Sequence, residues 1–83
     1  MNETGLILFS TDYCALCDEA LGLLLSMPEL AGISLRVVDV ADDDELVTAY
    51  GQRLPVLCFA GRELDWPFGA NDVLRWIRKI EQA

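Results

Sequence analysis

The sequence has 83 residues, of which 53% are hydrophobic and 24% are charged, so we expect one globular domain over residues 1–83. Fourteen acidic against six basic side chains give a formal net charge of -8, which disfavours nucleic acid as a partner because phosphate groups would be repelled. The sequence has neither an apolar run that could span a membrane nor a basic leader before an apolar stretch. We therefore expect a cytoplasmic protein with no membrane partner.

A βαβ unit is predicted for the first half of the chain. The continuous apolar run at residues 6–9 is typical of a buried strand. The next apolar residues recur with helical period, and this helix must end near Pro28 because proline disfavours helical geometry in the residue before it. Residues 35–40 are rich in β-branched side chains and predict a strand parallel to the first, since a long helical crossover separates the two. The buried stripe of the helix would comprise Leu16, Ala20, Leu23, Leu24 and Met27.

A short helix and a β-hairpin are predicted next. Asp42 stands three residues before Glu45, which is a capping arrangement, and Gly51 is well placed to end the helix. Residues 56–60 and 62–66 are separated by a glycine turn and predict a β-hairpin. The apolar face of the short helix would comprise Leu46, Val47 and Tyr50.

A final helix completes the predicted fold. Asn71 or Asp72 is expected to cap it, and basic residues near its C-terminal end suit the helix dipole. The order β-α-β-α-β-β-α predicts an α/β fold in which a parallel pair is extended by a hairpin into a four-stranded mixed sheet, with helices on both faces. The buried face of the final helix would comprise Val73, Leu74, Ile77 and Ile80.

The number and spacing of the cysteines limit which kinds of reactive site the chain can form. Cys14, Cys17 and Cys58 are the three cysteines, and the sequence has no histidine. Small secreted domains that are held together by disulfide bonds usually contain a larger, even number of cysteines, so three cysteines do not fit that class. Without histidine a Cys–His nucleophile cannot form, and a four-ligand zinc site would need a carboxylate or a second chain. Redox chemistry of the close pair is the leading interpretation.

The segment from Cys14 to Cys17 lies at the predicted junction of the first strand and the first helix. Unpaired N–H groups and the helix dipole at such a junction stabilise a thiolate, which favours Cys14 as the nucleophile. The i, i+3 spacing places Cys17 on the same side, where it could resolve a mixed disulfide. A zinc, copper or bridged iron–sulfur site in a binding module, or inert packing, are the alternatives, and the position of the pair favours the redox role. Cys58, in an apolar strand, is expected to be a core residue.

Together these features resemble the glutaredoxin-like branch of the thioredoxin superfamily. Residues 53–56 (Arg-Leu-Pro-Val) are similar to the family's cis-proline segment, residues 59–63 to its hairpin, and residues 68–72 to its turn into the last helix. The resemblance implies a thioredoxin-like fold and thiol–disulfide exchange, with Cys14 as nucleophile and Cys17 as resolving cysteine. It implies substrate contacts by Leu54, Pro55, Gly69, Asn71 and Asp72. Arg53, a candidate carboxylate anchor just before Pro55, and Tyr13, next to Cys14, are also expected to contact the substrate.

The chain departs from typical dithiol glutaredoxins around the cysteines. Residues 15–16 are Ala-Leu instead of Pro-Tyr, and no lysine precedes the motif. Asp12, Asp18 and Glu19 place negative charge there, which disfavours a thiolate and repels an anionic tripeptide. We expect a monomer with no metal and no bound cofactor that acts on a disulfide-containing protein or a small thiol substrate. Glutathione or a thioredoxin reductase system is the expected source of electrons.

Overall fold

The computed structural model describes residues 5–82, in which four strands and three α-helices follow one another in the predicted order. The elements are β1 (Leu6–Ser10), α1 (Ala15–Leu25), β2 (Leu35–Asp39), α2 (Asp44–Tyr50), β3 (Val56–Phe59), β4 (Arg62–Asp65) and α3 (Ala70–Glu81), with short 3-10 turns η1 (Pro28–Leu30) and η2 (Val40–Asp42).

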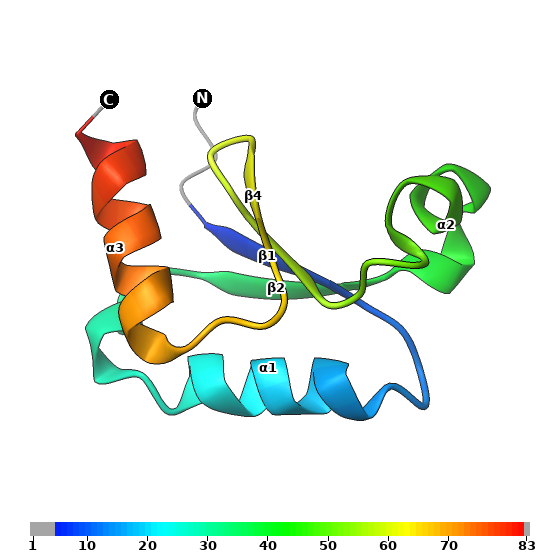
Figure 1. The fold of residues 1–83 in the computed structure, drawn as a ribbon, viewed down its shortest axis with the longest axis horizontal. Helices are drawn as coiled ribbons and strands as arrows, with labels where there is room; N and C mark the ends of the chain where they lie inside the picture. The colour runs from blue at the N-terminus through cyan, green and yellow to red at the C-terminus, as the bar shows by residue number, and fades with distance from the viewer. Residues whose placement is uncertain (1–4, 83) are drawn as a thin grey trace.

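The strands form one mixed sheet in the order β2-β1-β3-β4 (Figure 1). β1 is parallel to β2, where Leu8 lies opposite Val37, and antiparallel to β3, where Leu8 lies opposite Leu57. β3 and β4 form the expected hairpin, whose turn residues Ala60 and Gly61 both have positive φ. Two-residue hairpin turns often require that left-handed geometry because it matches the twist of the strands. The predicted α/β architecture is confirmed.

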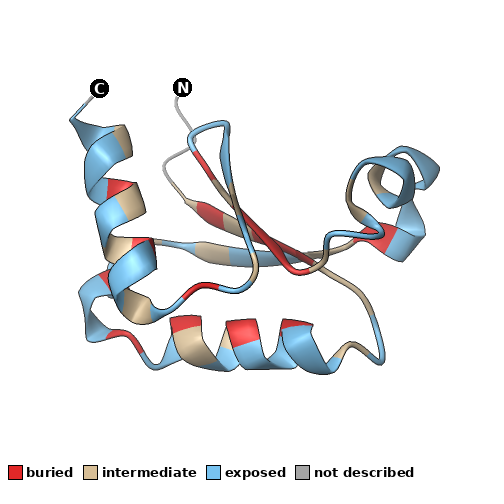
Figure 2. Ribbon diagram, in the orientation of Figure 1, coloured by how far each residue is buried: buried red, intermediate tan, exposed pale blue. Residues whose placement is uncertain are grey.

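One face of the sheet packs against α1 and α3. Figure 2 shows buried residues along the sheet and on the sides of these two helices that face it. Strand alternation turns Leu6 and Leu8 toward this layer, and the helical period turns Val73 and Ile77 toward it, as predicted. Burying each such side chain contributes about 1.5–3 kcal/mol. The buried members of this core are Leu6, Leu8, Ala20, Leu24, Met27, Leu30, Leu57, Phe59, Phe68, Val73 and Ile77.

The opposite face of the sheet is covered in part by α2. Phe9 and Val56 are buried beneath it, and the Phe9 ring stacks on Tyr50 with 4.2 Å between ring centroids. Because α2 has seven residues, it spans one end of this face, and Ile7 and Cys58 stay half-buried. Helices therefore lie on both faces, and the second layer is the smaller.

The start of α2 differs from the sequence prediction. Asp43 is its N-cap, and the Oδ1 atom of this residue accepts a hydrogen bond of 2.8 Å from the N–H two residues ahead. The prediction of Asp42 as the cap was wrong because residues 40–42 form η2, which Asp39 caps. Val47 is 44% exposed, so it does not belong to the buried face of the helix.

The start of α3 also differs. Gly69 is the N-cap, with extended backbone, so the helix begins before the predicted caps Asn71 and Asp72. Asp72 sits in the first turn and reaches back, and its Oδ2 accepts a hydrogen bond of 2.8 Å from the Gly69 N–H. A carboxylate inside the first turn thus satisfies the donor that precedes the helix.

Candidate active site

The predicted redox segment and the predicted proline segment meet at one end of the sheet. β1 ends at Ser10 and leads into the loop that carries Cys14. β3 runs the other way, and its first residue, Val56, pairs with Phe9 at that same end. Pro55, immediately before Val56, therefore lies beside the point where the chain leaves β1. Antiparallel pairing has brought together segments that are about forty residues apart in the sequence.

Cys14 occupies the capping position of α1. Its backbone is extended, and its Sγ accepts a hydrogen bond of 3.2 Å from the Cys17 N–H. A sulfur in this position faces the positive end of the helix dipole and an otherwise unpaired N–H, and both stabilise a thiolate. The expected location of Cys14 at the strand-to-helix junction is confirmed.

The two cysteines of the motif form a disulfide and differ in exposure. Cys14 and Cys17 are joined by the bond, with 5.2 Å between their Cα atoms. Cys14 is half-buried, whereas Cys17 is 2% exposed and belongs to the buried side of α1. Of the two sulfur-bearing residues, Cys14 is therefore the one that a molecule in solution can reach.

Tyr13 lies beside Cys14 and is fully exposed. Its φ of 57° is in the left-handed region, which a tyrosine seldom adopts, and it turns the loop immediately before the capping cysteine. Beside it is a shallow groove of about 250 Å³ between the β1–α1 loop, α1 and the edge strand β2. The groove is lined by Ser10, Thr11, Asp12, Tyr13, Asp18, Leu21, Val37 and Asp39.

The proline segment is packed into the sheet end. Pro55 is fully buried. Leu54 is half-buried and packs against the cluster of Phe9, Val40 and Val56 beneath α2. The Leu54–Pro55 peptide bond is cis, and so is the Trp66–Pro67 bond, which was not expected from the sequence.

Arg53 is held by partners that were not predicted. Its Nη2 lies 2.9 Å from Glu63 Oε1 and 2.7 Å from Asp65 Oδ1, and its guanidinium carbon lies 5.5 Å from the centroid of the Tyr50 ring. Glu63 and Asp65 are two residues apart on β4, so both point to the same face of the sheet. The alternation of Glu63 and Asp65 along β4 could have indicated from the sequence that two carboxylates share a face. It does not indicate that Arg53 is the cation they bind.

Tyr50 completes this group through its hydroxyl. The hydroxyl donates a hydrogen bond of 2.7 Å to Glu63 Oε2. This bond, with a smaller contribution from burial, raises the pKa of Tyr50 to about 12. The pKa of Glu63 is lowered, first by Arg53 and then by Tyr50. We call Tyr50, Arg53, Glu63 and Asp65 the Arg53 cluster.

Gly69, Asn71 and Asp72 are not brought to the cysteines. Figure 1 shows that α3 begins toward the C-terminal end of α1, whereas Cys14 precedes the opposite end of α1. Asp72 is engaged locally with the Gly69 N–H and with Arg75 Nη2 at 2.9 Å. These two partners, the N–H first, lower the pKa of Asp72.

Cys58 lies on the α2 face of the sheet, apart from the disulfide. It is a half-buried free cysteine in β3. Burial, followed by the negative charge of Glu63, raises the pKa of its thiol, which disfavours the reactive thiolate.

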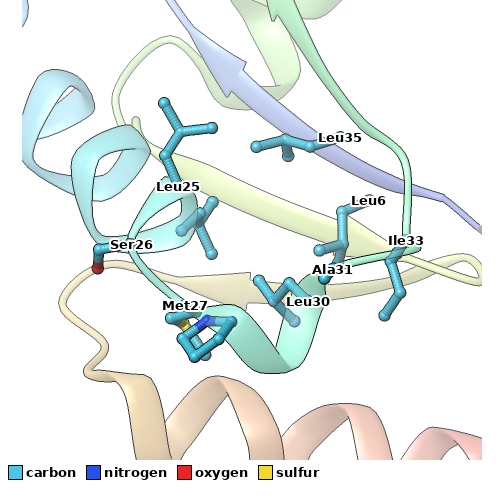
Figure 3. A pocket seen from close by; sticks show the side chains of 10 residues that line it. Leu6, Leu25, Ser26, Met27, Leu30, Ala31, Ile33 and Leu35 are labelled. Atoms are coloured by element: carbon cyan, nitrogen blue, oxygen red, sulfur yellow. The ribbon is translucent and has the colours of Figure 1, made fainter.

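Three further observations concern residues 5–82. An apolar hollow of about 530 Å³ lies at the far end of α1 from Cys14, and Figure 3 shows aliphatic side chains around it. It has no titratable side chain, so it is not a candidate for the reaction. These residues contain no group of three or more His, Cys, Asp and Glu placed to hold a metal ion, and none of their helices has the length and apolarity needed to cross a bilayer.

Solved structures share the fold. The crystal structure of target protein XcR50 from X. campestris is 39% identical, with a TM-score of 0.79 over 90% of this chain and 97% of that chain. Protein Ne2328 from Nitrosomonas europaea is 20% identical, with a TM-score of 0.73 over 92% and 93%. Thioredoxin 1 from Thermosipho africanus TCF52B is 16% identical, with a TM-score of 0.69 over 95% and 96%. The fold is therefore thioredoxin-like.

The family of the chain follows from a separate comparison. Curated proteins give no significant match. Residues 5–78 match the family model described as Glutaredoxin-like domain (DUF836). As the cysteine pair and the proline segment indicated, the chain belongs to this glutaredoxin-like family.

Proposed function

We propose that this protein is a thiol–disulfide oxidoreductase that reduces protein or small-molecule disulfides through Cys14 and Cys17. The observation that carries the proposal is the place of Cys14, an accessible sulfur at the capping position of α1, bonded to a buried partner. Membership of a glutaredoxin-like family supports a redox role. Tyr13, Leu54 and Pro55 are the proposed contacts for the substrate, because Tyr13 precedes Cys14 and the Leu54–Pro55 segment lies at the same end of the sheet.

The first step uses the thiolate of Cys14. In the dithiol form this thiolate is stabilised by the Cys17 N–H and by the helix dipole. It attacks one sulfur of the substrate disulfide, so that a bond to Cys14 forms and the substrate S–S bond breaks. The departing thiolate takes a proton from water. The product is a mixed disulfide between Cys14 and half of the substrate.

The second step uses Cys17. After losing its proton to water, Cys17 attacks the sulfur of Cys14, one helical turn away, and expels the remaining substrate thiolate. Two electrons have then passed from the protein to the substrate, and the Cys14–Cys17 disulfide remains. Two equivalents of an external thiol such as glutathione, or a thioredoxin reductase, would restore the dithiol.

Single serine variants test this division of roles. In the assay, the oxidoreductase in its dithiol form reduces a disulfide in a substrate protein. The external reductant that restores the dithiol is oxidised in turn, and its oxidation is followed by absorbance. Cys14→Ser should reduce the rate to the uncatalysed background. Cys17→Ser should still attack, but should accumulate a mixed disulfide that mass spectrometry detects as the added mass of the substrate.

Cys58→Ser is the matched control, because it removes a thiol from the opposite face of the sheet. Its rate should stay near that of the parent protein. Undiminished turnover by Cys14→Ser, or a mixed disulfide located at Cys58, would contradict the proposal. Recycling rates measured separately with glutathione and with a thioredoxin reductase identify the source of electrons.

A further inference from the structure

Arg53 is a cation at the active-site end of the sheet whose charge is already compensated. It lies two residues before Pro55, and Nη2 contacts carboxylate oxygens of both Glu63 and Asp65 within 3 Å. A single guanidinium between two carboxylates leaves no excess positive charge for a ligand. The two carboxylates accept hydrogen bonds that the guanidinium could otherwise donate to a carboxylate of an anionic substrate.

Contacts from several helices and strands hold the Arg53 cluster in place. Glu63 and Asp65 project from the same face of β4, and Glu63 also accepts the hydroxyl hydrogen bond of Tyr50 from the end of α2. Tyr50 in turn stacks on Phe9 of β1, one residue before the end of that strand. The Arg53 cluster is thereby tied to the strand that leads into Cys14.

The other basic side chains do not compensate for this loss of free charge. All six basic residues of the sequence fall within the described chain. Arg36 pairs with Ile7, near the start of β1, and Arg62 begins β4, at the sheet end opposite the cysteines. The other three, Arg75, Arg78 and Lys79, are on α3.

On the other side of the Cys14 loop the groove carries acidic side chains. Asp12, Asp18 and Asp39 line it, and its lining includes no basic residue. A disulfide that approaches Cys14 therefore meets carboxylates on the β2 side and a neutralised arginine on the β3 side. Exposed charges interact over about 10 Å at 0.1 M salt, so these groups act on a substrate even without direct contact.

We propose that Glu63 and Asp65 are specificity-determining residues of this site. Because Glu63 and Asp65 form ion pairs with Arg53, this arginine is not free to bind anionic thiols and disulfides. The site therefore prefers disulfides with neutral or cationic flanking groups. The inference rests on the proposed function, because it concerns which disulfides the Cys14–Cys17 pair reduces.

Three small disulfides of different charge provide the test. Glutathione disulfide is anionic, hydroxyethyl disulfide is neutral and cystamine is cationic. In the parent protein, kcat/KM should fall in the order cystamine, hydroxyethyl disulfide, glutathione disulfide, and the spread should narrow at high salt because screening weakens exposed interactions. A parent protein that uses glutathione disulfide as well as cystamine would overturn the inference.

The double variant Glu63→Gln, Asp65→Asn frees Arg53 with little change in side-chain size. The ratio of kcat/KM for glutathione disulfide to that for hydroxyethyl disulfide should rise about fivefold, the upper range for an exposed ion pair. Most of this change should come from a lower KM for glutathione disulfide. Adding Arg53→Gln should abolish the rise, since the gain depends on the freed guanidinium.

The matched control is Glu29→Gln, Glu81→Gln, which removes the same charge from exposed positions in η1 and at the end of α3. Its ratio should stay within twofold of the parent value. An equal rise in the control would show that only net charge matters and would overturn the inference. An unchanged ratio in the folded double variant would overturn it as well.

A single variant is available if the double variant does not fold, as judged by circular dichroism. Asp65→Asn alone keeps the Tyr50–Glu63 hydrogen bond and should raise the same ratio about twofold. No turnover of any of the three disulfides would overturn the proposed function itself, and the inference with it, whereas turnover without charge preference overturns the inference alone.

Discussion

The variant Leu8→Ala tests the packing of β1, the strand that leads into the loop carrying Cys14. Leu8 lies in β1, between β2 and β3, and its exposure is 0%. Two residues later the strand ends and the chain turns toward Cys14. Leu8→Ala removes three carbon atoms, which costs about 2.4 kcal/mol at about 0.8 kcal/mol for each buried carbon. The cavity that remains raises the expected loss in the free energy of unfolding to about 2–5 kcal/mol.

Thermal unfolding followed by circular dichroism measures this loss. A domain of this size has a total stability of about 4–12 kcal/mol, and each kcal/mol lost lowers Tm by about 4–8 °C. Leu8→Ala should therefore lower Tm by at least about 8 °C. Leu25→Ala is the control, since Leu25 is 71% exposed on α1 and its loss should change stability by about 0.5 kcal/mol or less. Equal shifts in the two variants would refute the assignment of Leu8 to the core.

Three further predictions follow from local geometry. Gly22→Ala should stabilise the protein by about 0.5–1 kcal/mol in urea unfolding, because Gly22 is inside α1 and a Cβ there meets nothing within 4 Å; a loss of stability would contradict this geometry. In the reduced protein, limited alkylation with peptide mass analysis should label Cys14 before Cys58, whose thiolate is disfavoured by burial; the reverse order would contradict the site. In Tyr13→Phe the remaining phenol is Tyr50, and its phenolate absorbance should appear with a midpoint near pH 12. The neutral phenol is favoured in the folded protein, so its stabilising effect is present below pH 10 and is lost as the pH rises through about 12; a midpoint near 10 would show that the bond to Glu63 is absent.

The sequence by itself determined the features that depend on neighbouring residues. The apolar run of β1 and the helical stripes of α1 and α3 are local periodicities. They predicted these elements and most of their buried residues, but the expected burial of Leu16 was wrong, since this residue is 46% exposed in the first turn of α1. The position of Cys14 at a strand-to-helix junction follows from the same patterns, because a helix start is defined by the few residues around it. The redox role proposed for Cys14 rests on that position.

Tertiary structure decided what depends on distant residues. Arg53 lies between α2 and β3, and its carboxylate partners lie ten and twelve residues away on β4. Only the register of the β3–β4 hairpin and the placement of α2 bring them together. The position of Gly69, away from Cys14, likewise depends on where the loop after β4 crosses the sheet. Periodicity predicts which side chains point to a face, but an ion pair or a shared site needs two segments to meet at one place. Strand order and register set that meeting, and they are fixed by the packing of the whole domain.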